Sequence, residues 1–278
     1  MSNYVENKVI IITGSGGGFG RLVAGKVAAL GARVVVSDVD EKLVASATDE
    51  IRSAGGEVEG MRADVTDRSQ MAALAARAVD RFGAIDVMVN NAGVMPLALY
   101  ADHEIAGEAW DRCIDINFKG VLHGISCVHD QMKAQGRGHV VNISSIYGNY
   151  PVAGAAVYGA TKAAVNVLSE SLRQESQGRI KVTTIRPTGV PGTGLGAGVL
   201  NVEAIRGVLG SQADEYFANL GEIFGENPPA DLVDPEKIGF FSMSPEILAD
   251  QIVFAINQPW GVSISDLTVR ASGDSYMI

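Results

Sequence analysis

The chain has 278 residues, with 47% hydrophobic side chains and a formal net charge of −10 at pH 7. This size and composition predict a globular protein with a large buried core, and we expect residues 1–278 to form a single domain. The acidic charge argues against a nucleic-acid partner, because a phosphate backbone requires a basic face. It also argues against binding to an anionic membrane surface.

The sequence contains no segment with the features of a membrane anchor or a secretory signal. No apolar run approaches the ~20 residues that span a bilayer. The first residues also lack a basic stretch followed by an apolar one. A cytoplasmic location is therefore expected. The two cysteines and four histidines have neither metal-ligand spacing nor the pattern of a disulfide framework, so we predict no metal site.

The first predicted strand, 8–14, leads directly into a glycine-rich stretch and then an amphipathic helix over 19–30. Glycines let a backbone approach a phosphate closely, and a helix N-terminus offers free N–H groups. Asp38 ends the second predicted strand, 33–38, where a carboxylate accepts hydrogen bonds from the ribose hydroxyls of a dinucleotide. Strand, glycines, helix and Asp38 together predict dinucleotide binding.

Asp38 also indicates which dinucleotide binds. A carboxylate repels the 2′-phosphate of NADP, and Val39 and Asp40 follow it where a base would neutralise that phosphate. No basic residue lies between Gly14 and Gly20 either. The sequence therefore favours NAD.

Strand and helix patterns continue to alternate along the chain. Helices are predicted over 41–54, 68–82, 106–135 and 157–176, and strands over 58–64, 85–93, 138–145, 180–187 and 262–269. This alternation predicts an α/β fold of the Rossmann type, a doubly wound parallel sheet of about seven strands flanked by helices. Residues 188–243 interrupt the pattern and are too long for an ordinary connection. We expect them to form a helical insertion that acts as a substrate loop or lid.

Several motifs resemble those of the short-chain dehydrogenase/reductase family. The glycine spacing is Thr-Gly-x-x-x-Gly-x-Gly, and the sequence then contains ADV (63–65), NNAG (90–93), DINFKG (115–120) and YGATK (158–162). The resemblance covers about residues 5–190. It implies a single-domain enzyme that uses NAD, and it implies a homotetramer or homodimer in which the helices of 106–135 and 157–176 pack between subunits.

The resemblance also implies a set of cofactor-binding residues, which come from the carboxyl ends of several strands. They are Gly14, Ser15, Gly18, Phe19, Gly20, Asp38, Val39, Asp64, Val65, Asn91, Ala92, Gly93, Tyr158, Lys162, Pro187, Val190 and Thr193. The chain departs from the family pattern after Pro187, because Thr188 replaces the usual glycine. The carboxamide contacts assigned to Val190 and Thr193 depend on how the chain accommodates that change.

The predicted catalytic residues are Tyr158, Lys162, Ser145 and Asn117. Tyr158 would transfer the proton, and the charge of Lys162 one helical turn later would favour its ionised form. Ser145 would hydrogen-bond the substrate oxygen, and the resemblance implies that Asn117 fixes a water that relays protons from Lys162. Ser144 is the rival serine, although Ser145 has the family's spacing of thirteen residues before Tyr158. The alternative to this catalytic role is that Tyr158 and Lys162 form an ordinary pair on a helix surface.

The insertion carries eight acidic residues against Arg206 and Lys237, together with many apolar residues. The apolar residues of the insertion either pack the lid onto the domain or line a hydrophobic substrate site. The predicted substrate contacts outside the insertion are Ser145, Tyr147, Tyr158 and Met95. We expect a neutral secondary alcohol or ketone, alicyclic, terpenoid or steroid-like. The alternatives are a 3-oxoacyl reductase, disfavoured because the acidic lid repels anionic carriers, and a non-catalytic NAD-binding regulator.

Overall fold

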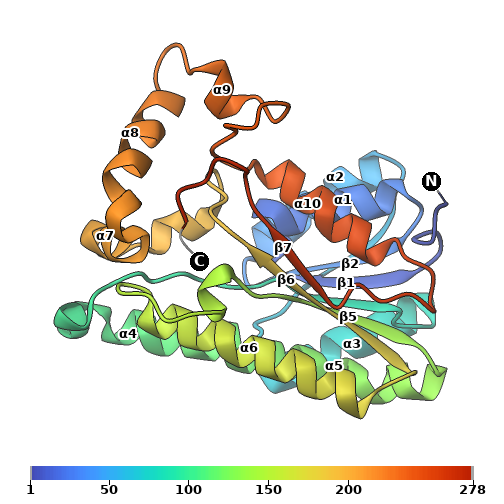
Figure 1. The fold of residues 1–278 in the computed structure, drawn as a ribbon. Helices are drawn as coiled ribbons and strands as arrows, with labels where there is room; N and C mark the ends of the chain where they lie inside the picture. The colour runs from blue at the N-terminus through green and yellow to red at the C-terminus, as the bar shows by residue number, and fades with distance from the viewer. Residues whose placement is uncertain (1, 277–278) are drawn as a thin grey trace.

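The structure, a computed structural model, describes residues 2–276. Within them, a single parallel sheet has the strand order β3-β2-β1-β4-β5-β6-β7 (Figure 1). The strands are β1(Val9–Thr13), β2(Arg33–Asp38), β3(Glu57–Arg62), β4(Val87–Asn90), β5(Gly138–Ile143), β6(Ile180–Pro187) and β7(Asp266–Val269). The predicted Rossmann-type fold is confirmed.

The predicted strands are all present, and two of them, β4 and β7, are about half as long as expected. In β4 the predicted residues 91–93 leave the sheet, because the chain turns there toward the loop that follows β1. The last strand, β7, pairs only with β6 and lies at the edge of the sheet, so its pairing begins at Asp266 and not at 262.

The two faces of the sheet are covered by different helices. In β1, Ile10 and Ile12 belong to one apolar cluster and Val9 and Ile11 to another, as expected for a strand buried on both faces. The first face packs against α1(Gly18–Ala29), α2(Glu41–Ser53) and α10(Pro245–Ile256). The second packs against α3(Arg68–Phe82), α5(Gly120–Gln135) and α6(Ala156–Glu175) (Figure 1).

Helix α10 is not among the predicted elements. It packs along α1, and its side chains Leu248, Ile252 and Ile256 are almost fully buried. The helix is apolar around most of its circumference, so it lacks the stripe that identifies a surface helix. Its start nevertheless carries a readable signal, because the Ser244 hydroxyl caps the helix and Pro245 follows at its first turn.

The long helix predicted over 106–135 is interrupted. Helix α4(His103–Ile114) continues through a π-helical turn, Asp115–Lys119, into α5. Such turns shift the register of a helix by one residue and occur often at functional sites. The turn places Asn117 inside the protein, where its side chain is fully buried.

The insertion folds as a chain of short helices beyond the carboxyl end of the sheet. After a 3-10 turn, Gly194–Gly198, come α7(Val202–Leu209), α8(Ala213–Ile223) and the short α9(Ala230–Val233), so the insertion is helical as expected (Figure 1). Its predicted apolar residues divide between two roles. Phe240 and Phe241 are buried, whereas Phe224 and Ile238 are 71% and 87% exposed, so packing explains only part of the set.

Three cations surround one tryptophan at the end of the sheet opposite the glycine-rich loop. The Lys8 and Lys181 ammonium groups and the Arg137 guanidinium lie 4.7, 5.4 and 5.3 Å from the Trp260 ring centroid. Burial, and to a smaller extent the nearby charge of Lys8, lowers the pKa of Lys181 to about 8.

Among the described residues, no helix combines the length and apolar character that a membrane span requires.

Candidate active site

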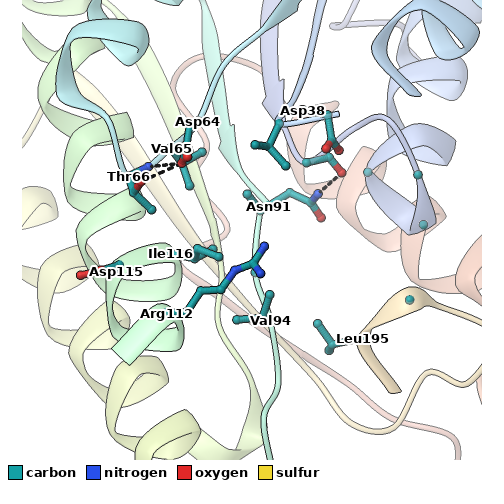
Figure 2. Close-up of a pocket in the computed structure, with 18 of the residues that line it drawn as sticks. Asp38, Asp64, Val65, Thr66, Asn91, Val94, Arg112, Asp115, Ile116 and Leu195 are labelled. Atoms are coloured by element: carbon teal, nitrogen blue, oxygen red, sulfur yellow. Dashed lines mark hydrogen bonds between the residues drawn. The ribbon is translucent and has the colours of Figure 1, made fainter. Parts of the chain in front are cut away.

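A cavity of about 740 Å³ lies where the sheet order reverses, between β1 and β4 (Figure 2). Ligands in open α/β sheets bind at this switch point, beyond the carboxyl ends of the strands. The glycine-rich loop forms one wall, Asp64 and Asn91 follow β3 and β4, and Arg112 and Ile116 come from the helix beyond β4. A cavity of this volume is within the range of cofactor sites.

The glycine-rich loop has a shape that side chains would prevent. Gly14 has a φ of +62°, and a Cβ there would lie 2.8 Å from the Ala92 backbone. Gly18 also has a positive φ of +54°, and a Cβ on Gly20 would lie 2.4 Å from the Asn91 side chain. The backbone therefore forms an open cradle at the N-terminus of α1, which fits the pyrophosphate of a dinucleotide.

The Asp38 carboxylate is held in place at the wall of the cavity. One oxygen accepts a hydrogen bond from the Gly16 amide at 3.1 Å, and the other accepts one from the Asp40 amide at 3.2 Å. These two bonds fix the carboxylate at the end of β2, as predicted for a residue that binds ribose hydroxyls.

Asn91 ties the end of β4 to the glycine-rich loop. Its side-chain amide donates to the carbonyls of Thr13 and Gly14 at 2.8 and 2.9 Å. Across the cavity, one Asp64 oxygen accepts from the Thr66 amide and hydroxyl (Figure 2). The other Asp64 oxygen has no hydrogen-bond partner among the described residues, so it can accept a hydrogen bond from a ligand.

Most of the predicted cofactor residues line this cavity. Those that do are Gly14, Gly18, Phe19, Gly20, Asp38, Val39, Asp64, Val65, Asn91, Ala92, Gly93 and Thr193. Ser15 lies outside the lining, because its hydroxyl is fully buried and donates to the Ile12 carbonyl at 2.7 Å. Pro187 ends β6 away from the cavity, and Val190 packs against the core.

Arg112 is a lining residue that the sequence analysis missed. It is the only basic side chain in the described cavity wall, and Figure 2 shows it reaching inward beside Ile116 and Val94. The wall's acidic side chains are Asp38, Asp64, Glu108, Asp111 and Asp115. A signal was available, because Arg112 stands four residues before Ile116 in the helix predicted over 106–135, which places both on one helical face.

Ser145, Tyr158 and Lys162 come together behind the cavity. The turn that follows β5, Ile146–Gly148, packs so tightly on α6 that a Cβ on Gly148 would lie 2.7 Å from the Lys162 backbone. The Ser145 hydroxyl lies beside the Tyr158 phenol, where it lowers the pKa of that phenol, and it accepts a hydrogen bond from the Tyr147 amide at 3.2 Å. The rival Ser144 instead donates to the Lys162 carbonyl at 3.1 Å, so it faces the backbone of α6.

Burial sets the protonation of the two titratable groups. It raises the pKa of Tyr158, and the hydrogen bond from Ser145 partly offsets this effect. It lowers the pKa of Lys162 to about 8. The Lys162 ammonium donates to the Ile143 carbonyl at 2.8 Å and lies 5.6 Å from the Tyr158 ring centroid. Tyr158 is therefore a neutral proton donor at neutral pH in this geometry, and Lys162 alone does not ionise it.

Asn117 acts on the backbone that follows β4. Its side-chain oxygen accepts from the Val94 amide at 2.9 Å, and its amide donates to the Val94 carbonyl at 2.8 Å. The side-chain amide is thus used to hold the backbone at Val94 and does not face a water that leads to Lys162.

Gly93 separates the cavity from the catalytic group. It lines the cavity, and a Cβ on it would lie 3.3 Å from the Asn117 side chain and 3.7 Å from the Lys162 ammonium. Ser145, Tyr158 and Lys162 are each about 5% exposed. They therefore lie directly behind the cavity wall and outside its lining.

The family model of the short chain dehydrogenases matches residues 8–201, about 70% of the chain. The chain belongs to the short-chain dehydrogenase/reductase family. An uncharacterized oxidoreductase of Listeria innocua is 31% identical over 95% of this chain and 96% of its own. A 2,5-dichloro-2,5-cyclohexadiene-1,4-diol dehydrogenase of Sphingobium indicum is 36% identical over 68% of this chain and 76% of its own.

Solved structures of the family share the whole fold. One from Burkholderia phymatum, in complex with NAD, has a TM-score of 0.74 and 28% identity, and the match covers 96% of this chain and 90% of that one. A metagenomic member in complex with NADP has a TM-score of 0.71 and 27% identity over 96% and 97%. The family neighbours thus bind either nicotinamide dinucleotide, and the chain is an oxidoreductase of this family.

Proposed function

We propose that the protein is an NAD-dependent dehydrogenase that interconverts a secondary alcohol and its ketone. The observation that carries this proposal is the placement of Ser145, Tyr158 and Lys162 together behind Gly93, at a cavity whose opposite end holds Asp38. A proton donor and a hydrogen-bonding hydroxyl beside a dinucleotide site are the groups that carbonyl reduction needs.

NAD is the proposed cofactor. Gly14, Gly18 and Gly20 would receive its pyrophosphate at the N-terminus of α1, and Asp38 would bind the adenosine ribose. Arg112 would supply the cationic partner of the phosphates in a wall that is otherwise acidic. Because the Asp38 carboxylate is fixed by two amides, it cannot easily move away from a 2′-phosphate, which disfavours NADP.

The chain's own residues provide the proton chemistry. When bound, the nicotinamide accepts the hydride in alcohol oxidation and supplies it in ketone reduction. In ketone reduction, Tyr158 donates its proton to the substrate oxygen while Ser145 hydrogen-bonds that oxygen. Lys162 would hold the cofactor ribose with the N–H groups not used by Ile143, and Asn117 would hold the backbone at Val94 in position.

The proposed substrate is neutral and hydrophobic, with an alicyclic, terpenoid or steroid-like skeleton. An apolar cluster surrounds Tyr158 and includes Leu97, Ile146 and Val208. The relative from Sphingobium indicum is named for a cyclic diol, which supports a ring substrate for this chain. The acidic insertion disfavours an anionic acyl carrier.

A rate assay on separate alcohols tests this proposal. Cyclohexanol, borneol and a hydroxysteroid are offered with NAD or NADP, and a 3-oxoacyl thioester is offered with NADH or NADPH. We expect turnover of a cyclic alcohol with NAD, and a loss of about a hundredfold or more in the Tyr158→Phe variant. Turnover of the thioester alone would contradict the substrate class, and NAD binding without any turnover would contradict the enzymatic function.

We also propose a cytoplasmic homotetramer, or a homodimer, on the basis of the family's usual assembly. Ala160 and Ser171 on α6 are exposed and available for subunit contacts. Ser169, another small residue of this helix, is instead buried and accepts a hydrogen bond from Asn142 at 2.8 Å, so it belongs to the core.

A further inference from the structure

Three tyrosines form a connected group on the substrate side of Tyr158. Tyr147 follows β5, Tyr216 comes from α8, and Tyr276 comes from the tail that follows β7. The ring of Tyr147 lies 6.0 Å from that of Tyr158 and 6.1 Å from that of Tyr276, which lies 6.0 Å from that of Tyr216. The contacts are edge-to-face, a favourable arrangement for aromatic rings.

The tail that carries Tyr276 is held in place at both ends. Arg270 donates to the Asp274 carboxylate and to the Tyr276 carbonyl, each at 2.5 Å. The Gly273 amide donates to the Phe240 carbonyl at 2.9 Å, which joins the tail to the end of the insertion. The position of the Tyr276 ring is therefore fixed by the fold.

The Tyr276 side chain joins two parts of the proposed site. A Cβ on Gly189 would lie 2.2 Å from its hydroxyl, so it contacts the segment between Pro187 and Thr193 to which the nicotinamide contacts are assigned. Its ring also meets that of Tyr147 edge-to-face, and the Tyr147 ring meets that of Tyr158 in the same way. Tyr276 is thus linked both to the proton donor and to the segment expected to hold the nicotinamide.

The three tyrosines bring hydrogen-bonding hydroxyls into largely apolar surroundings. Each neutral phenol has one O–H donor, and burial raises the pKa of Tyr147 and Tyr276, which keeps both neutral. Tyr147 and Tyr276 belong to a cluster of apolar residues that includes Leu97, Val199 and Val208. A polar group of a ligand in such surroundings is stabilised by a hydrogen-bonding partner.

We propose that Tyr276, with Tyr147 and Tyr216, forms a polar subsite that binds a second oxygen of the substrate. The substrate is then a hydrophobic ring alcohol that carries another hydroxyl or keto group away from the reacting carbon. This inference rests on the proposed alcohol dehydrogenase function and assigns Tyr276 as a specificity-determining residue.

The test compares cyclohexanol with the three positional isomers of cyclohexanediol, using NAD and the wild-type, Tyr276→Phe, Tyr216→Phe and Tyr4→Phe proteins. In the wild type we expect at least one diol to have a kcat/KM about tenfold above that of cyclohexanol, the value of about one hydrogen bond. Tyr276→Phe keeps the ring and should reduce this ratio to within about twofold of unity. Tyr4→Phe, a control remote from the site, should keep the ratio.

The outcomes separate the two proposals. Turnover of no cyclic alcohol by the wild type would overturn the proposed function together with the subsite. Turnover of cyclohexanol without a preference for any diol, or a preference that survives in Tyr276→Phe, would overturn the subsite alone. Binding of NADH, followed by its fluorescence, shows that each variant is folded. If Tyr276→Phe does not bind NADH, the Tyr216→Phe variant decides. A reduced ratio of kcat/KM for the diol to that for cyclohexanol is expected in Tyr216→Phe, and an unchanged ratio would contradict the subsite.

Discussion

Asp38 is the residue whose substitution should change the cofactor preference. Its carboxylate is fixed by the Gly16 and Asp40 amides, and removing its charge removes the repulsion of a 2′-phosphate. In Asp38→Asn we expect the ratio of kcat/KM for NAD to that for NADP to fall about tenfold or more. Glu41→Gln removes an exposed charge nearby and should leave the ratio unchanged. A wild type that prefers NADP would contradict our interpretation of Asp38.

Arg112 should affect the affinity for both dinucleotides. As the basic side chain of the described cavity wall, it would attract phosphates that NAD and NADP share. We expect Arg112→Gln to raise the Kd of NADH about three- to tenfold in a fluorescence titration, and added salt should shrink the difference. The control is Arg179→Gln, on an exposed residue between α6 and β6. An equal Kd in Arg112→Gln and the wild type at low salt would exclude the contact.

Lys162 should make the free energy of unfolding depend on pH. Its pKa is about 8 in the folded protein, against an ordinary lysine value of 10.5, so between these pH values the unfolded chain binds more protons. The free energy of unfolding contributed by Lys162 therefore rises with pH from about 8 to 10.5, by on the order of 2–3 kcal/mol. Denaturant unfolding at several pH values should show this rise in the wild type relative to Lys162→Met. A difference that stays flat over this range would contradict the lowered pKa.

At the scale of elements, the turn between β1 and α1 depends on the absence of a side chain. Gly14→Ala places a Cβ against the Ala92 backbone and forces a left-handed conformation, which costs about 1–2 kcal/mol before any clash. We expect a lower Tm and a weakened affinity for NADH. Gly25→Ala in α1 is the matched control, because a Cβ there meets no atom within 4 Å, and it should stabilise by about 0.5–1 kcal/mol. Equal effects of the two substitutions would rule out the strained turn.

The elements also show what the sequence could and could not predict. The strands of the sheet have strong apolar runs, and the glycine spacing and Asp38 indicate the dinucleotide site because local sequence determines that turn. Helix α10 escaped prediction because burial on most sides removes the amphipathic stripe. Tyr276 escaped as well, since its contact with Tyr147 joins residues more than a hundred positions apart, and no local pattern encodes such a pairing.

At the scale of the whole molecule, the outer face of α6 carries an exposed apolar residue. Val167 is 65% exposed in the middle of this helix, and α4 beside it exposes Ile105 at 71%. If this face lies between subunits, Val167→Glu should shift the assembly from a tetramer or dimer toward smaller species, because it places a charge in an apolar contact. Light scattering after size-exclusion chromatography would show this shift as a lower molar mass. Phe224→Glu on the insertion is the control. A wild type that is already monomeric would contradict the proposed assembly.

The position of Trp260 among three cations, at the end of the sheet opposite the glycine-rich loop, has a consequence for fluorescence spectroscopy. The chain has two tryptophans, Trp110 and Trp260. Trp110 lies on α4 between two residues of the cavity wall, Glu108 and Arg112, whereas Trp260 lies near Lys8 at the start of β1. Intrinsic fluorescence therefore combines a reporter beside the cofactor cavity with one beyond the far end of the sheet. Replacing either tryptophan by phenylalanine would leave a single fluorescent tryptophan. The variant that keeps Trp110 would report ligand binding at the cavity, and the variant that keeps Trp260 would report unfolding at the far end of the sheet.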